Sequence, residues 1–338
     1  MMPKVYIARP VPPEVEAFIS KYCQYEKWNG PEPITRSQLL KEISDVEGLL
    51  ITGEKIDDEL LDHAPCLKTV SNISVGYNNF DLEAMKKRSI IGTNTPDVLN
   101  ETVADLALAL MLSTARRIPE LDKLVKDGKW GKKGDEPLFG VDVHGKTLGI
   151  IGMGRIGESI ARRCKFGFNM EVLYYNRRRK SEVEETLSTT YSSLEHLLRE
   201  SDFVLLMVPY TPETRHLLGR EQFALMKKSA IFINTSRGQT VDEKALIEAL
   251  QNKEILAAGL DVFEQEPVSP DNPLLAMPNV VTLPHIGSAT YQTRFDMAML
   301  AAKNLVAAVS GREVSNVVPE LKGLQSLNSE KSLTHRKY

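Results

Sequence analysis

The strongest constraint on the fold is a regular alternation of short β-branched runs with segments of helical periodicity. The runs KVYIA, GLLIT and LKTVSNISVG each precede a helical pattern, at 15–22, 57–63 and 82–88 respectively. The alternation begins again at TLGIIG, residues 147–152, and continues through VLYYN, FVLLMVP, AIFINTS, AAGLDVF and VVTLPHIG. Strands that alternate with helices form parallel sheets with crossover helices. We therefore expect an α/β protein in which two parallel-sheet units follow one another.

The length of 338 residues also favours two domains, because one hydrophobic core rarely supports so long a chain. A strongly apolar helical pattern over 101–117 connects the two units, and the Gly- and Lys-rich stretch 126–133 after it is expected to be an extended loop. A long helical pattern from Thr290 to about Val309 ends before Gly311 and could return the chain to the first unit. The polar segment after Pro319 lacks periodicity, and we expect it to be flexible.

Composition is typical of a globular enzyme and argues against several other classes. The net charge of −3 supplies no broad positive field, so we expect no nucleic-acid partner. The apolar runs are too short for a signal peptide or a membrane span. Cys23, Cys66 and Cys164 are odd in number and widely spaced, which favours a reducing, cytoplasmic location, three buried thiols, and neither a disulfide framework nor a metal site.

A glycine-rich turn marks the start of the second unit. Gly152, Gly154 and Gly157 have the spacing G-x-G-x-x-G, directly after an apolar strand and directly before a helical pattern. The first glycine permits a tight turn, the second lets the backbone approach a pyrophosphate, and the third lets helix and strand pack closely. Because the helix N-terminus offers free N–H groups to phosphate, this context predicts a dinucleotide site.

The end of the next strand indicates which dinucleotide is bound. NAD-specific sites usually place an acidic residue there to hold the ribose 2′-hydroxyl. Here the strand ends in Asn176, and Arg177, Arg178, Arg179 and Lys180 follow. Guanidinium groups grip a 2′-phosphate, so we expect NADP(H) to be preferred and NAD(H) to be possible. The alternative is an ordinary solvated run of charges.

Three polar segments follow the later strands of the second unit. They contain Arg237 in NTSRGQT, Glu266 in GLDVFEQEP and His285 in LPHIGSAT. Ligands of open α/β sheets bind outside the carboxyl ends of the strands, so these side chains could converge on one crevice. Each is weak evidence alone, since a single histidine after a strand is more often structural than catalytic.

Together these motifs resemble the D-2-hydroxyacid dehydrogenase family, from residue 3 to residue 319. Within it the chain is most similar to the branch of glyoxylate and hydroxypyruvate reductases and 2-ketogluconate reductases. The resemblance is carried, in order, by SVGYNNFD at 74–81, ETVAD at 101–105, GIIGMGRIG at 149–157, INTSRG at 233–238, GLDVFEQEP at 259–267 and PHIGSAT at 284–290.

The resemblance implies a 2-oxoacid reductase that forms a D-2-hydroxy acid. Arg237 binds the substrate carboxylate and carbonyl, His285 is the acid/base, and Glu266 orients and charges the histidine. Physical chemistry supports these roles, because hydride transfer to the carbonyl carbon leaves negative charge on oxygen that an imidazolium stabilises and protonates. A carboxylate on the far ring nitrogen favours the imidazolium, and arginine matches two carboxylate oxygens.

The resemblance implies further contacts. The backbone N–H groups of Val75 and Gly76 would bind the substrate carboxylate; the alternative for Gly76 is that it serves only the turn. Asn100, beside the active site, is implied to bind the substrate. Cofactor contacts are implied for Thr102 at the nicotinamide, Arg155 and Ile156 at the phosphates, Val208 and Pro209 at the adenosine, Asp261 at the carboxamide, and Thr235, Ser236, Gly287 and Ser288. Tyr77, Arg294 and Phe139 match family positions near the site or a neighbouring subunit, or are packing and surface residues.

The implied architecture is two Rossmann-like domains, one flavodoxin-like and one doubly wound, with an interdomain cleft. The cofactor domain, 101–289, is inserted into a substrate domain formed by 1–100 and 290–320, a flexible tail covers 321–338, and the region 101–142 forms a homodimer interface. Two rivals remain. A dinucleotide-sensing corepressor would keep the fold but needs a partner-binding groove and often an appended segment, and the intact Arg–Glu–His set favours an enzyme. A D-3-phosphoglycerate dehydrogenase would have cations in the substrate loop, where residues 73–81 have none.

Overall fold

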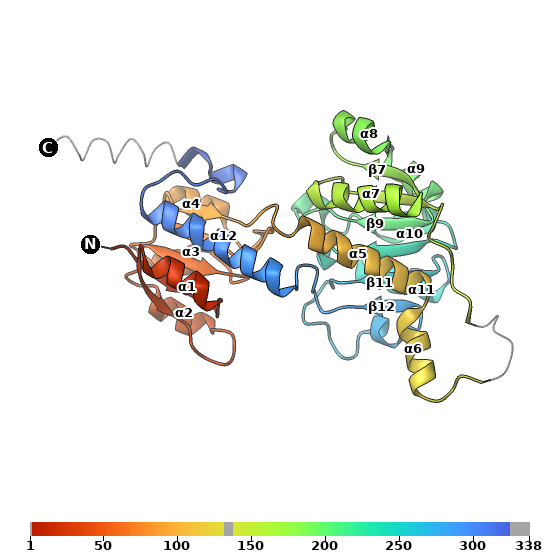
Figure 1. Cartoon of the computed structure of the whole chain (residues 1–338), viewed down its shortest axis with the longest axis horizontal. Helices are drawn as coiled ribbons and strands as arrows, with labels where there is room; N and C mark the ends of the chain where they lie inside the picture. Colours follow the sequence, from red (N-terminus) through yellow and green to blue (C-terminus); the bar gives the residue numbers. More distant parts are fainter. Residues whose placement is uncertain (1, 132–137, 325–338) are drawn as a thin grey trace. The chain divides into compact units, whose positions relative to one another are not determined.

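A computed structural model describes residues 2–131 and 138–324 and confirms the α/β class with two all-parallel sheets (Figure 1). One compact unit comprises Met1–Leu99 and Thr290–Tyr338, and the other comprises Asn100–Ala289. Leu321, the first residue of the segment 321–338 that we expect to be flexible, is fully buried in the core of the first unit. Residues 325–338 lie outside the described residues.

The first unit is built on five parallel strands in the order β2-β1-β3-β4-β5. This is a flavodoxin-like order, whose topological switch point lies between β1 and β3. Polar β2 alternates exposed and half-buried residues at the sheet edge, whereas β3 is buried throughout. The strands are β1 (Lys4–Ile7), β2 (Gln24–Lys27), β3 (Gly48–Ile51), β4 (Thr69–Asn72) and β5 (Ile91–Thr93).

Helices cover this sheet and are fixed by specific caps. Asp57 and Asp81 cap α3 and α4 by accepting from backbone N–H groups, and Thr35 forms a capping box at α2. The long helix α12 packs across β3 and β4, where the Ser71 hydroxyl donates to the Ala301 carbonyl over 2.7 Å. The helices are α1 (Pro13–Ser20), α2 (Arg36–Glu42), α3 (Asp58–Asp62), α4 (Leu82–Lys87) and α12 (Tyr291–Val309), with a 3₁₀ turn η5 (Pro319–Leu321).

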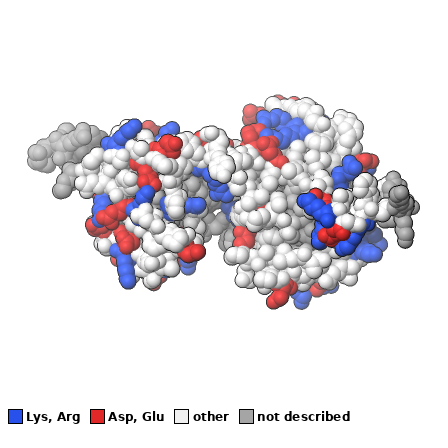
Figure 2. Space-filling view, turned by 60° about the horizontal axis from the view of Figure 1, so that its bottom comes forward, with Lys and Arg blue, Asp and Glu red and all other residues white. Residues whose placement is uncertain are grey.

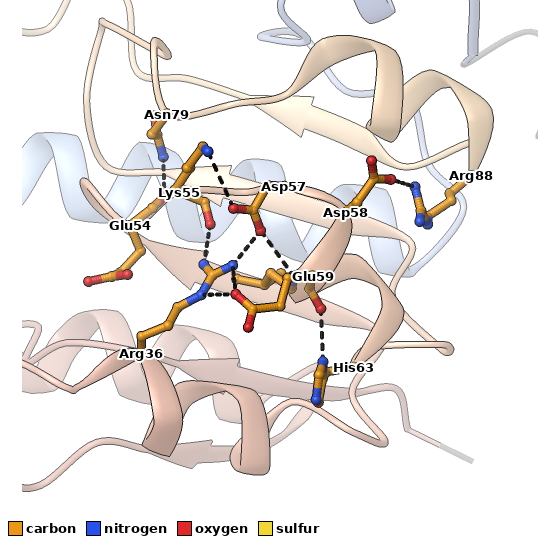
Figure 3. Close-up of polar contacts among 10 residues, drawn as sticks. Arg36, Glu54, Lys55, Asp57, Asp58, Glu59, His63, Asn79 and Arg88 are labelled. Atoms are coloured by element: carbon orange, nitrogen blue, oxygen red, sulfur yellow. Dashed lines mark hydrogen bonds and ion pairs between the residues drawn. The ribbon is translucent and has the colours of Figure 1, made fainter.

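An arginine joins two of the loops at the carboxyl edge of this sheet. Arg36, at the start of α2, donates to the Lys55 carbonyl and pairs with Asp57 and Glu59 before and within α3 (Figure 3). On the neighbouring segment, the Asn79 amide donates to the Glu54 carbonyl over 2.8 Å. These contacts hold the β2–α2 and β3–α3 connections together.

The second unit is built on seven parallel strands in the order β12-β11-β10-β9-β6-β7-β8. This is a doubly wound order with its switch point between β6 and β9. The central strands are buried on both faces, as expected of a parallel sheet between helices. The strands are β6 (Thr147–Ile151), β7 (Glu171–Tyr175), β8 (Thr190–Tyr191), β9 (Phe203–Leu206), β10 (Ile231–Asn234), β11 (Ala257–Leu260) and β12 (Val280–Thr282).

Two groups of helices enclose this second sheet. Ala107 and Ile160, from α5 and α7, share one core cluster, and Leu197, Phe223 and Leu246, from α9, α10 and α11, share another (Figure 1). The helices of this unit are α5 (Asn100–Ala115), α6 (Ile118–Lys126), α7 (Arg155–Phe168), α8 (Ser181–Leu187), α9 (Leu194–Glu200), α10 (Arg220–Leu225) and α11 (Glu243–Gln251), with 3₁₀ turns η2 (Pro212–Thr214), η3 (Gly238–Thr240) and η4 (Pro273–Ala276).

The surface carries charges of both signs. Figure 2 shows Lys and Arg interspersed with Asp and Glu on the drawn face of each unit. Among the described residues, no helix is long and apolar enough to cross a membrane. Cys23 and Cys164 are buried, but the expectation of three buried thiols is wrong for Cys66, which is exposed. The stretch 126–133 begins with the last residue of α6, and its last two residues lie outside the described residues.

Candidate active site

The glycine-rich turn lies at the switch point of the second sheet, between the end of β6 and the start of α7. Gly152 has φ +107°, and a Cβ there would lie 2.4 Å from the Met207 carbonyl oxygen. A Cβ on Gly157 would lie 2.6 Å from the Gly152 oxygen, whereas Gly154 faces open space. The turn is therefore closed where strand and helix pack and open at the N-terminus of α7, where a diphosphate would bind.

A buried hydroxyl supports the fit of a dinucleotide to this unit. Thr235, directly after β10, is 8% exposed, and its Oγ1 has no hydrogen-bond partner within the described part of the chain. Buried polar atoms are normally paired, so an unpaired one marks a position where a ligand can bind. Val208, after β9, lies against the turn, since a Cβ on Gly152 would be 2.9 Å from its Cγ1.

The cations after β7 divide into two kinds. Arg179 pairs with Glu184, and Lys180 pairs with Glu158 on α7 over 2.5 Å. Arg177 and Arg178 are exposed and have no ion pair among the described residues. Asn176 does not extend toward solvent, because its Oδ1 accepts from the Met153 N–H over 2.7 Å and its Nδ2 donates to the Met153 carbonyl. Two arginines of the four cations are thus available to a phosphate.

Arg237, Glu266 and His285 follow three adjacent strands that are in register. Asn234 of β10 pairs with Leu260 of β11, which pairs with Thr282 of β12, so the three connections leave one edge of the sheet together. His285 Nδ1 lies 2.7 Å from Glu266 Oε2. Its Nε2 has no partner among the described residues and is left for a ligand.

The electrostatics of the three side chains are coupled. Burial raises the pKa of Glu266, but hydrogen bonds from His285 and the Phe263 N–H, and the charges of His285 and Arg237, outweigh it and lower the pKa. Burial lowers the pKa of Arg237, an effect that Glu266 opposes. Glu266 is therefore ionised at neutral pH, where its charge stabilises an imidazolium beside it.

Buried polar residues position these groups, and the sequence does not reveal that role. Asn234 accepts from the N–H and hydroxyl of Ser236 and donates to the Arg237 carbonyl, which shapes the turn that carries Arg237. Both oxygens of Asp261 accept from backbone, one from Ile286 N–H and one from Gly287 N–H, each over 2.8 Å. Asp261 thus fixes the segment after His285. Strand-end Asn and Asp beside turn residues were the available signal.

The loop that is predicted to bind the substrate carboxylate, residues 74–76, follows β4 in the first unit. The carbonyls of Ser74, Val75 and Gly76 accept from the Thr95 N–H, Asn94 Nδ2 and Asn72 Nδ2, over 2.9, 2.8 and 2.8 Å. The N–H groups of Val75 and Gly76 have no hydrogen-bond partner within the described residues. A loop whose carbonyls are fixed and whose N–H groups are free is suited to bind an anion.

The remaining predicted residues lie at the ends of elements. Tyr77 donates to Glu320 over 3.2 Å, and burial together with Glu320 raises the pKa of Tyr77 to about 12, so it has a structural partner. The others lie as follows: partly buried Asn100 and Thr102 in the first turn of α5, exposed Arg155 and partly buried Ile156 in the first turn of α7, exposed Pro209 after β9, buried Ser236 after β10, partly buried Ser288 after buried Gly287, and exposed Arg294 and Phe139.

The fold and site define a class of protein. A doubly wound sheet with a glycine turn at its switch point binds dinucleotides, and a paired histidine and carboxylate beside an arginine suits proton transfer to an anionic substrate. Residues 108–287 match the family model described as D-isomer specific 2-hydroxyacid dehydrogenase, NAD binding domain. The chain belongs to the D-isomer specific 2-hydroxyacid dehydrogenase family and is an NAD(P)-dependent oxidoreductase.

Similar proteins cover nearly the whole chain. Glyoxylate/hydroxypyruvate reductase B of an Enterobacter species is 51% identical over 94% of this chain and 98% of its own. The protein of that name from Klebsiella pneumoniae is 50% identical over 95% of this chain and 100% of its own. A crystal structure of NADPH-dependent glyoxylate/hydroxypyruvate reductase from Sinorhizobium meliloti, in complex with NADP and malonate, has a TM-score of 0.83 and 35% identity, covering 95% of this chain and 98% of that one.

Proposed function

We propose that the protein reduces small 2-oxo acids, glyoxylate and hydroxypyruvate first among them, to D-2-hydroxy acids with NADPH. The observation that carries this proposal is the 2.7 Å contact between His285 Nδ1 and Glu266, which leaves Nε2 to a substrate. The names of the relatives support the same substrates.

Different residues of the chain bind the substrate and transfer the proton in this reaction. In the second unit, Arg237 binds the substrate carboxylate. In the first unit, the N–H groups of Val75 and Gly76 are suited to an anionic group of the substrate. A bound nicotinamide supplies the hydride. His285 gives its Nε2 proton to the carbonyl oxygen. The C=O π bond breaks, the C–O single bond stays, and a C–H bond to the hydride and an O–H bond to the proton form. The Glu266 carboxylate stabilises the imidazolium before that transfer.

We propose that NADPH is preferred over NADH. Arg177 and Arg178 are the unpaired cations at the end of β7, and a ribose 2′-phosphate is the group that two guanidinium ions would bind. Asn176 supports this preference, because a neutral amide bound to the glycine turn does not repel a phosphate as a carboxylate would. NAD(H) remains a weaker cofactor.

We also propose that the protein is a homodimer that works in the cytoplasm. Among the described residues of the region 101–142, α6 has no buried residue. Four large apolar side chains of this region are at least 50% exposed: Ile118, Val125, Trp130 and Phe139. Such a cluster on one segment is typical of a protein interface. Residues 132–137 lie outside the described residues.

Steady-state oxidation of NADPH tests the function. We expect turnover with glyoxylate and hydroxypyruvate, and a test with 2-ketogluconate, pyruvate and phosphohydroxypyruvate defines the range. Preference for phosphohydroxypyruvate would instead indicate the D-3-phosphoglycerate dehydrogenase reaction. Cofactor binding without reduction of any 2-oxo acid would favour a dinucleotide-sensing binding protein.

A further inference from the structure

Two hydrogen bonds set the direction of the N–H groups of Val75 and Gly76. A peptide bond is planar and trans, so the N–H of one residue points opposite to the carbonyl of the residue before it. The Ser74 carbonyl accepts from the Thr95 N–H over 2.9 Å, which orients the Val75 N–H. The Val75 carbonyl accepts from Asn94 Nδ2 over 2.8 Å, which orients the Gly76 N–H.

The Thr95 N–H is oriented in turn by an asparagine of α12. Asn304 Nδ2 donates to the Asn94 carbonyl over 3.1 Å, and this carbonyl shares a peptide plane with the Thr95 N–H. A bond on one side of that plane directs the N–H on the other side toward the Ser74 carbonyl. Asn304 thus acts on the Val75 N–H through two peptide planes, and both N–H groups of the loop depend on an asparagine side chain.

A third asparagine closes a ring of hydrogen bonds. Asn316, in the segment after α12, accepts at its carbonyl from the Asn94 N–H over 3.2 Å. Its Nδ2 donates to Asn304 Oδ1, also over 3.2 Å. The end of β5, the helix α12 and the segment after it meet at this ring, and all three belong to the first unit. Val317 and Val318, next along the chain, are buried in the core of that unit, so the ring is anchored to packed elements.

Asn304 places an amide among the buried residues of α12. It is 4% exposed, and the adjacent Leu305 and Val306 are fully buried. A buried amide is costly unless its polar atoms are paired, and both atoms are paired here. An apolar side chain could fill the same space without needing partners. The amide is therefore explained by the backbone of Asn94 that it holds rather than by the packing of the core.

We propose that Asn94 and Asn304 are positioning residues, which orient the Gly76 and Val75 N–H groups to bind an anionic group of the substrate. This inference rests on the proposed function, which assigns that group to the loop after β4. An oriented N–H binds the anion equally before and during hydride transfer. Loss of the orientation should therefore weaken substrate binding and leave the chemical step unchanged.

Steady-state kinetics of Asn94→Leu test the direct contact, because leucine is similar in size and has no amide donor. The KM for glyoxylate should rise about tenfold, kcat should stay within about twofold of wild type, and the KM for NADPH should not change. A purely structural loss would instead reduce the active fraction, which lowers the apparent kcat and leaves KM unchanged. The matched control is Asn279→Leu, because Asn279 is also partly buried and its Nδ2 donates to the Leu256 carbonyl over 2.9 Å. It should leave the KM for glyoxylate unchanged.

The Asn304→Leu variant tests the contact that acts through the backbone. Leucine suits the apolar surroundings on α12, so we expect the variant to fold. The KM for glyoxylate should rise about threefold, because one neutral hydrogen bond is lost and the Asn94 side chain is kept. An unchanged KM for glyoxylate in Asn94→Leu would overturn the proposal. Should Asn94→Leu fail to fold, an unchanged KM in Asn304→Leu would overturn it instead.

Binding of oxalate gives a readout that needs no turnover. Oxalate is a two-carbon dicarboxylate that resembles glyoxylate and accepts no hydride. Calorimetric titration of the protein with NADP present should give a Kd for oxalate that is about tenfold higher in Asn94→Leu and unchanged in Asn279→Leu. Reduction of glyoxylate with an unchanged oxalate Kd in Asn94→Leu would remove the positioning role and leave the reductase. Weaker oxalate binding in Asn94→Leu, in a protein that reduces no 2-oxo acid, would remove the reductase and keep the positioning role.

Discussion

His285 can present only one ring nitrogen to a substrate, because Glu266 engages the other. Glu266 is itself oriented, with Oε1 accepting from the Phe263 N–H over 3.0 Å and Oε2 facing the imidazole. The histidine side chain is 46% exposed, so a ligand can reach it without movement of the core. A fixed ring with one accessible nitrogen is what proton transfer at a defined atom requires.

His285→Gln tests this role at the level of one side chain. The amide keeps a polar group but cannot donate a proton as an acid, so kcat should fall by about 10²–10⁴-fold. NADPH affinity, followed by nicotinamide fluorescence, should change little because His285 is not among the phosphate-binding groups. A variant with near wild-type kcat would refute the assignment.

The arginines after β7 give a second test at the residue scale. Arg177→Ala with Arg178→Ala should lower kcat/KM with NADPH by about tenfold or more, while kcat/KM with NADH changes little. Arg179→Ala is the control, because Arg179 is already paired with Glu184. Equal losses with both cofactors in the double variant would mean that these residues do not read the 2′-phosphate.

At the scale of elements, α5 and α7 are joined by a carboxylate. Glu101 in the first turn of α5 accepts from Ser159 and Arg162 on α7 and pairs with Arg163 over 2.7 Å. Burial raises the pKa of Glu101, but these hydrogen bonds outweigh it and lower the pKa to about 2. The glycine turn precedes α7, so this contact also secures the dinucleotide end of the helix.

Glu101→Gln should therefore show a pH-dependent loss of stability. A folded-state pKa below the ordinary 4.5 stabilises the fold above that value, and the stabilisation is lost as the pH falls toward about 2. Because the side chain is 57% exposed, the variant should be less stable by only about 0.5–1 kcal/mol at pH 7. Urea unfolding at pH 7 and 5 should show the same difference in the free energy of unfolding between wild type and variant, and a smaller difference at pH 3. A difference that is constant across the three pH values would contradict the assignment.

The sequence predicts some helices and strands of this fold better than others. Apolar β6 and β9 and the apolar helix α5 were evident, because burial demands hydrophobic residues throughout. β2, with the sequence QYEK, lies at a sheet edge and carries no such run, and β8 has only two residues. Helix α6 was missed for a related reason, since none of its residues is buried.

The site was predicted to a similar degree. Glycine spacing and strand ends are local signals, so the turn at Gly152 and the trio after β10, β11 and β12 could be found in the sequence. A pocket in the first unit lined by Arg9, Trp28 and Glu54 could not be found in this way, because its wall joins three segments that only the strand order brings together. The pairing of Arg179 and Lys180 likewise depends on carboxylates in other turns.

At the scale of the whole molecule, the two sheets share one topological feature. Each reverses its order at one point, between β1 and β3 in one and between β6 and β9 in the other. A pocket of about 340 Å³ lies at the switch point of the first unit, and the glycine turn lies at that of the second. The backbone of each unit thus provides a binding position before side chains refine it.

The oligomeric state is a prediction for the whole molecule. Light scattering after gel filtration should give twice the 37.8 kDa mass of the chain. Val125→Asp, in the exposed apolar segment, should shift the species toward monomer, because a charge in an apolar interface is costly. Leu275→Asp, an exposed apolar residue outside that segment, should remain dimeric. A wild-type monomer at working concentration would discard the interface.

The backbone conformation at His285 links catalytic activity to thermal stability. Its φ is +53°, a left-handed conformation that residues other than glycine adopt at a cost, smaller for asparagine, aspartate and histidine than for most, and the N–H bonds of the next two residues to Asp261 hold it there. The imidazole is thus retained at a position where the backbone itself favours glycine. The His285→Asn variant should consequently have a Tm no lower than that of the native protein while being a poor catalyst. Selection for thermal stability alone would therefore tend to remove the catalytic histidine.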